Sequence, residues 1–163
     1  MPAKLTQPRW THIALPVSDL EKSIDFYTSV TPLVVVQHNE DENGKGVWLS
    51  NDKQVEDPFV LVLAQFIPEV GARFDVVEGE KVPIMKPFAH IGIEMPNRED
   101  VDEVAARAKE RGALQFGPQD MAAHIGYVCF VEDPDGNIVE FSHNQKVYDA
   151  IQNLWGDGSD TQA

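Results

Sequence analysis

The sequence has little cysteine, little positive charge and no long apolar run, and each shortage excludes a class of protein. Cys129 is the one cysteine among 163 residues, which excludes an internal disulfide and a thiolate zinc cluster. Only 13 basic side chains stand against 27 acidic ones, a net charge of −14, so nucleic acid and membrane surfaces are poor partners. No apolar run approaches the roughly 20 residues that span a bilayer. Residues 1–10 lack the apolar core of a signal peptide, so we expect a cytoplasmic protein.

The chain repeats a β-α-β-β-β pattern. The first copy starts with a strand at Thr11–Val17 and the second with a strand at Ala89–Met95. Each strand has a histidine in its second place, and these histidines, His12 and His90, lie 78 residues apart. A helical pattern follows each strand. Since one copy alone is small for a good core, we expect the two copies to pack into one continuous sheet.

This organisation predicts an α+β protein built from paired modules. Within the first module, Ser18 and Glu21 have the spacing of a capping box at the helix start. The strand Phe59–Phe66 is almost entirely apolar, which is typical of a strand buried on both faces. The predicted boundaries are 9–66 for the first module, 67–87 for a linker or lid, 88–145 for the second module, 146–155 for a C-terminal helix, and 1–8 and 156–163 for mobile tails.

Glu140 is the residue that most needs an explanation. It lies in a predicted strand among the apolar residues Ile138, Val139 and Phe141. An ionised carboxylate is costly to bury without a partner. No lysine or arginine lies in any predicted core strand. A divalent cation held by two imidazoles and one carboxylate satisfies Glu140 and leaves coordination positions open for a substrate. A single strand histidine is usually structural, so the hypothesis depends on His12, His90 and Glu140 together.

The pattern resembles the vicinal oxygen chelate superfamily, also called the glyoxalase/bleomycin resistance/dioxygenase superfamily. The resembling stretches are residues 11–27 (THIALPVSDLEKSIDFY), 89–95, and above all 126–141 (GYVCFVEDPDGNIVEF). The resemblance implies two modules that form a curved, open mixed sheet around a metal-binding cavity, and a homodimer. It also implies a small-molecule substrate and one divalent metal held by the first and last strands of the modules. By position, His12, His90 and Glu140 match such ligands.

The first module departs from the family's pattern. Where glyoxalase-like members place a glutamate in the last strand, Leu61 and Leu63 are the expected counterparts, and neither binds a metal. Gln65 is either a fourth ligand in a shifted register or a cap of the strand end. The missing glutamate argues against a strict lactoylglutathione lyase. Two histidines and one carboxylate resemble the family's extradiol dioxygenases, fosfomycin-modifying transferases and epimerase-like members, and iron, manganese, zinc and nickel all stay open.

Two further groups of residues are candidates for the site. His124 and Tyr127 precede the final hairpin, where family members often place acid–base or substrate-orienting groups. The structural alternatives are an exposed loop histidine and a tyrosine half in the core. The other candidates line a substrate pocket: Gln65, Trp48, Phe66 and Phe116.

Together these observations favour a metal-dependent enzyme whose small substrate chelates the metal through vicinal oxygens. The reaction, whether that of a lyase, isomerase, dioxygenase or transferase, is not resolved by the sequence. The alternative is a metal-free binding protein of the bleomycin-resistance type, whose negative charge would attract a cationic ligand.

Overall fold

The computed structural model describes residues 10–55, 58–86 and 88–156. The predicted tail 1–8 lies outside these ranges, and so does all of the predicted tail 156–163 except Gly156. The chain divides into two compact units, the first formed by residues up to Ile84 with 134–136 and the second by 85–133 with residues from Asn137 onward. Among the described residues, no helix has both the length and the apolar character needed to cross a membrane.

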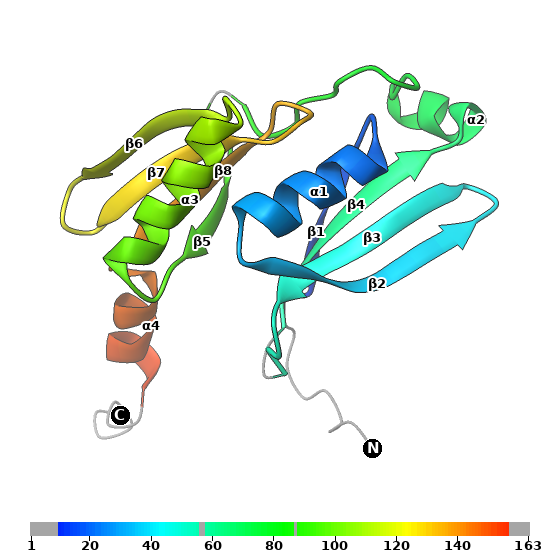
Figure 1. Cartoon of the computed structure of the whole chain (residues 1–163). Coiled ribbons are helices and arrows are strands. Elements are labelled where there is room, and N and C mark those ends of the chain that lie inside the picture. The colour runs from blue at the N-terminus through cyan, green and yellow to red at the C-terminus, as the bar shows by residue number, and fades with distance from the viewer. Residues whose placement is uncertain (1–9, 56–57, 87, 157–163) are drawn as a thin grey trace. The chain divides into compact units, whose positions relative to one another are not determined.

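The first unit contains a four-stranded sheet with one long helix on one face. Its strands run in the order β1-β4-β3-β2, with β1 parallel to β4 and the other neighbours antiparallel. Helix α1 packs against β2, β3 and β4 (Figure 1). The elements are β1 (His12–Pro16), α1 (Leu20–Val30), β2 (Leu33–Asp41), β3 (Gly44–Asn51), β4 (Val60–Phe66), α2 (Pro68–Gly71) and the 3₁₀ turn η1 (Ala72–Phe74).

The second unit repeats this topology. Its strands run in the order β5-β8-β7-β6, with β5 parallel to β8 and the other neighbours antiparallel. Helix α3 packs against β6, β7 and β8 (Figure 1). The elements are β5 (Ile91–Glu94), α3 (Arg98–Glu110), β6 (Leu114–Asp120), β7 (Tyr127–Glu132), β8 (Ile138–His143) and α4 (Val147–Trp155).

The α+β class and the two β-α-β-β-β modules are confirmed, but the strands form two four-stranded sheets and not one continuous sheet. Each module pairs its own first strand with its own last strand, so its ladders are completed internally. Each sheet also buries one face beneath its own helix. The expected single sheet is therefore replaced by two self-contained ones. The linker region 67–87 contains α2 and η1, and its role as a lid stays a prediction.

Strand β4 is buried on one face only, contrary to the expectation for Phe59–Phe66. Leu61 and Leu63 are buried, whereas Val62 and Ala64, which alternate with them, are partly exposed. Side chains alternate across a strand, and α1 covers only the face that carries the two leucines. The other face of the sheet is open, and a continuous apolar sequence does not by itself require a second covering layer.

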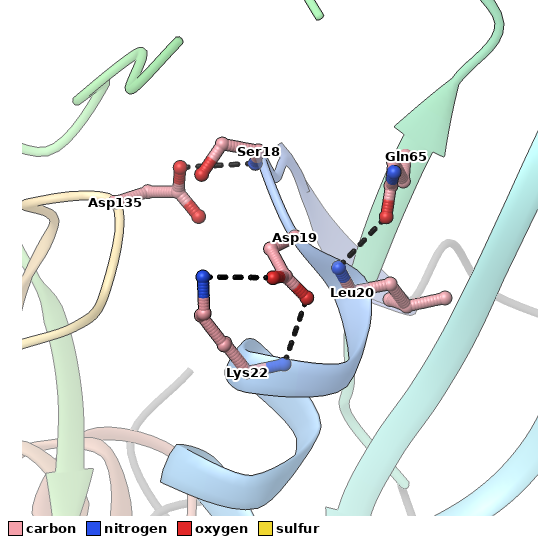
Figure 2. Close-up of polar contacts among 6 residues, drawn as sticks. All are labelled: Ser18, Asp19, Leu20, Lys22, Gln65 and Asp135. Atoms are coloured by element: carbon pink, nitrogen blue, oxygen red, sulfur yellow. Dashed lines mark hydrogen bonds and ion pairs between the residues drawn. The ribbon is translucent and has the colours of Figure 1, made fainter. Parts of the chain in front are cut away.

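Helix α1 begins one residue later than the predicted capping box. Its N-cap is Asp19, whose carboxylate accepts a hydrogen bond from the Lys22 amide at 3.1 Å. This bond lowers the pKa of Asp19. The Ser18 amide instead donates to Asp135 Oδ1 at 3.0 Å (Figure 2). The prediction for Ser18 and Glu21 is wrong because an aspartate directly after the serine is an equally good cap, and the Ser18 backbone is committed to the turn 134–136.

Candidate metal centre

Two of the predicted ligands meet on the open face of the second sheet. Glu140 lies in β8, where it pairs with Gly92 of the neighbouring β5, and His90 lies just before β5. Val139 and Phe141, on either side of Glu140, are buried on the opposite face beneath α3. The Glu140 side chain is 5% exposed, and its Oε2 is 3.5 Å from Nε2 of His90.

The backbone fixes which nitrogen of His90 faces the carboxylate. His90 Nδ1 is 2.7 Å from the carbonyl oxygen of Phe88. A carbonyl only accepts hydrogen bonds, so Nδ1 carries a proton, and in the neutral ring Nε2 carries the lone pair. In that neutral form Nε2 and the Glu140 carboxylate are two electron-pair donors side by side, whereas a protonated ring would form an ion pair with the carboxylate. An imidazole oriented by a carbonyl, next to a carboxylate, is a donor set that fits a divalent metal.

Aromatic rings surround the histidine on this face. The ring of His90 lies 5.7 Å from Phe88 and 5.6 Å from Phe130, both in edge-on arrangements. Phe116, a predicted pocket residue, continues the row with its ring 5.6 Å from Phe130. Phe88 is 85% exposed and Phe116 is 37% exposed, so these rings border His90 without enclosing it.

His12 has the matching place in the first unit. It begins β1, is exposed, and its Nδ1 lies 2.9 Å from the Thr11 hydroxyl. His12 and Ala14 share the open face, because Leu15 is buried on the other. Across residues 10–55, 58–86 and 88–156, no three His, Cys, Asp or Glu side chains gather closely enough to hold a metal ion. Within the second unit, His90 and Glu140 are therefore two donors of a set that needs at least one more.

The first module places an apolar residue where the second has Glu140. Two residues after His90, Gly92 pairs with Glu140; two residues after His12, Ala14 pairs with Val62. Val62 is therefore the register counterpart of Glu140. The expectation that Leu61 or Leu63 fills this place is wrong because both point to the helix-covered face. The conclusion drawn from that expectation, that the first module lacks the carboxylate, agrees with the observed register.

Gln65 uses its side-chain oxygen on the helix-covered face of the first sheet. Its Oε1 accepts a hydrogen bond from the amide of Leu20, the first residue of α1, at 2.8 Å (Figure 2). It lies three residues beyond Val62 on an extended strand, so the two side chains point to opposite faces. This arrangement serves the helix end and does not support Gln65 as a fourth ligand.

A cavity of about 610 Å³ lies on the open face of the first sheet. Its floor is the cross-strand pair Gly46–Ala64, whose small size leaves space between the larger Trp48 and Phe66. Trp48 pairs with Val62 and is 40% exposed. Two predicted pocket residues, Trp48 and Phe66, therefore border this cavity, and Gln65 lies beside it with its side chain on the other face.

Tyr127 lies on the face of the second sheet opposite to Glu140. Its hydroxyl donates to Asp102 Oδ1 of α3 at 2.5 Å, which together with burial raises the pKa of Tyr127. The guanidinium of Arg98 lies 3.5 Å over the tyrosine ring and forms two hydrogen bonds of 2.7 Å to Asp120. This arrangement fastens α3 to the sheet, and it separates Tyr127 from the His90–Glu140 pair.

His124 is exposed in the loop between β6 and β7. Its backbone carbonyl accepts a hydrogen bond from the Lys146 amide at 3.2 Å. The backbone of His124 thus helps to hold the start of α4, which corresponds to a structural role for this residue. No sequence pattern distinguishes this role from a catalytic one, because the contact involves only main-chain atoms.

Tyr127→Phe is expected to lower the free energy of unfolding by about 1 kcal/mol, because it removes one hydrogen bond. Metal affinity is expected to stay at the wild-type value, since the hydroxyl lies on the other face. Urea denaturation and titration with Mn²⁺ measure the two quantities. A variant of normal stability that no longer binds metal or turns over substrate would instead show that Tyr127 takes part in the metal site.

Comparison with known proteins defines the class to which this fold and donor pair belong. The chain belongs to the Glyoxalase/Bleomycin resistance protein/Dioxygenase superfamily, whose family model matches residues 9–141. The resemblance noted from the sequence is thus confirmed.

The individual proteins that the chain resembles share at most about a third of its sequence. An uncharacterized protein of Pseudomonas aeruginosa is 30% identical over 138 residues, which cover 85% of this chain and 90% of that protein. Lactoylglutathione lyase of Neisseria meningitidis serogroup A is 25% identical over 150 residues, covering 88% and 96%. A mutant of the fosfomycin resistance protein FosX of Listeria monocytogenes, crystallised with Mn(II) and 1S,2S-dihydroxypropylphosphonic acid, has a TM-score of 0.62 at 14% identity, covering 91% and 99%. This last likeness concerns the fold alone.

Proposed function

We propose that the protein is a metal-dependent enzyme whose small substrate binds the metal through two adjacent oxygens. His90 and Glu140 supply two ligands and His12 supplies a third. The observation that carries the proposal is the His90–Glu140 pair, in which a backbone-oriented imidazole nitrogen lies 3.5 Å from an almost fully buried carboxylate oxygen. The Gln145 amide satisfies one oxygen of that carboxylate, and a divalent cation beside the other would compensate the buried charge.

The absence of a carboxylate at Val62 has a chemical consequence for this proposal. Three protein ligands leave more of the metal's coordination positions for substrate than four. The bound metal would act as a Lewis acid on the substrate's oxygens. The FosX relative binds Mn(II) together with a compound that carries two adjacent hydroxyl groups, which agrees with a substrate of this kind. Two imidazoles and one carboxylate suit iron, manganese, zinc or nickel.

The surroundings of the pair would contribute by positioning the ligands and by giving the substrate an apolar border. The Phe88 carbonyl holds the ring of His90, and Phe130 and Phe116 form an apolar wall beside it. We propose that the cavity over Gly46 and Ala64 receives part of the substrate. The reaction, that of a lyase, isomerase, dioxygenase or transferase, stays open, and so do the predicted homodimer and cytoplasmic location.

Metal analysis of the purified protein tests this function. We expect about one divalent ion per chain in wild-type protein isolated without added metal, and loss of that ion in His90→Ala, because the variant removes a ligand whose orientation the backbone already fixes. Elemental analysis by mass spectrometry gives the stoichiometry. Retention of the ion in His90→Ala would contradict the proposed ligand set.

The second candidate is a metal-free binding protein that sequesters a cationic ligand. It is favoured by one feature: Asp41 borders the same cavity as Trp48 and, by its pairing with Gly44, lies on the same face of the sheet. A cation over a tryptophan ring near carboxylates is a common recognition geometry. The same metal analysis separates the candidates: wild-type protein without an ion that nonetheless binds a basic glycopeptide tightly supports the binding protein.

A further inference from the structure

The two oxygens of the Glu140 carboxylate have different partners. Oε2 lies 3.5 Å from Nε2 of His90, while Oε1 accepts a hydrogen bond of 3.0 Å from the side-chain amide of Gln145. Gln145 lies beyond the end of β8, five residues from Glu140, and is partly buried. One oxygen is thus held by a neutral donor while the other faces the imidazole.

The chain reverses sharply to bring Gln145 back over Glu140. Asn144 has a φ of 62°, in the left-handed region that asparagine tolerates better than most residues. This turn ends β8 and directs the following residue back along the strand. Lys146 then donates its amide to the carbonyl of His124 at 3.2 Å, so the segment that carries Gln145 is tied to the loop between β6 and β7.

Gly126 of that loop packs against the same turn. It has a φ of 87°, and a Cβ at this position would lie 2.2 Å from the His143 carbonyl oxygen and 3.0 Å from backbone atoms of Asn144. The absence of a side chain therefore allows main chain to approach main chain. Loop and turn together fix the backbone from which Gln145 reaches Glu140.

We infer that Gln145 is a positioning residue, which holds Oε1 of Glu140 so that Oε2 is the oxygen presented beside His90. This inference rests on the proposed function, in which Glu140 is a metal ligand. The terminal torsion of a glutamate is otherwise broad, so a donor on one oxygen fixes the plane of the carboxylate before the metal arrives. A neutral amide does this without neutralising the charge that the metal needs, unlike a lysine or an arginine. Partners of this kind outside the ligand set raise metal affinity.

Gln145→Met tests the inference, because methionine keeps the length of the side chain and removes the donor. In the full-length protein we expect the affinity for Mn²⁺ and for Zn²⁺, measured by competition with a chromophoric chelator, to fall about 10–100-fold. The melting temperature in EDTA should be unchanged, a combination that loss of packing alone would not produce. Gln145→Asn, which keeps the amide but withdraws it by one methylene, should also weaken binding.

Ser142→Ala is the matched control. Ser142 lies on the same face of β8 two residues after Glu140, is fully buried, and its hydroxyl has no hydrogen-bond partner among the described residues. Its removal should leave the metal affinity unchanged.

If His90→Ala abolishes binding while both Gln145 variants bind like wild type, the positioning role is overturned and the proposed function stands. If the wild-type protein binds neither metal, both are overturned. If both Gln145 variants lower the melting temperature in EDTA as well as the metal affinity, the role is structural and the inference is overturned.

Discussion

Glu140→Gln is expected to abolish tight binding of divalent metal while the metal-free protein stays folded. Glutamine has nearly the same shape, and its carbonyl oxygen still accepts the hydrogen bond that Gln145 donates to Glu140 at 3.0 Å. Its amide group, turned toward His90 Nε2, donates to the ring nitrogen that the carboxylate faces at 3.5 Å. What disappears is the negative charge. The expected loss of affinity exceeds the roughly 10–100-fold typical of residues outside the ligand set.

Thermal denaturation with and without metal measures this effect. A ligand that binds only the folded state at 100 times its dissociation constant adds about 2.7 kcal/mol of stability, so wild-type protein should melt at a higher temperature with metal and Glu140→Gln should not. Glu94→Gln is the matched control, because Glu94 lies on the neighbouring strand, pairs with Ser142 and is exposed. Equal loss of the metal response in both variants would point to a general effect of charge and against a ligand role for Glu140.

Gly126→Ala is expected to destabilise the protein far more than Gly112→Ala. Both glycines have a positive φ, 87° and 67°, so alanine costs about 1–2 kcal/mol at either position from backbone conformation alone. At Gly112 nothing lies within 4 Å of the added Cβ, whereas at Gly126 it meets the His143 carbonyl oxygen at 2.2 Å. That clash involves main-chain atoms on both sides, so relief requires the loop to separate from the turn that carries Gln145.

Urea denaturation of both variants in EDTA gives the free energies of unfolding. Gly112→Ala should lie within about 2 kcal/mol of wild type, and Gly126→Ala should lose clearly more. We also expect Gly126→Ala to bind metal more weakly than Gly112→Ala, since the displaced turn moves Gln145. Similar stabilities for the two variants would mean that the close approach at Gly126 contributes nothing to folding.

The features that sequence predicted well are those set by local periodicity. The repeat of His12 and His90 and the alternation around Glu140 require only that a strand turns every second side chain to the same face. That rule is sufficient to predict that Glu140 lies opposite Val139 and Phe141, as observed. The α+β modules follow from the same local patterns, because each contains its own helix and strands.

The features that were missed depend on register between distant segments. The counterpart of Glu140 is Val62 and not a neighbouring leucine, because the parallel pairing of β1 with β4 decides it, and a shift of one residue exchanges the two faces of a strand. Tyr127 raised the same difficulty: its face relative to Glu140 is set by the β7–β8 ladder, in which Phe130 pairs with Glu140. No sequence pattern indicates that Gln145 contacts Glu140, since its position follows from the left-handed backbone of Asn144.

The bond from the Ser18 amide to the Asp135 carboxylate means that the N-terminal unit is discontinuous in sequence (Figure 2). A fragment that stops at Ile84 would contain β1 to β4 and α1. It would lack Asp135, whose carboxylate accepts the hydrogen bond from Ser18 just before the helix. A first unit cut off at Ile84 would therefore leave the Ser18 amide without its partner, at a cost of about 1–3 kcal/mol. The repeats in the sequence and the compact units of the structure thus have different boundaries, because residues 134–136 of the second repeat belong to the first unit.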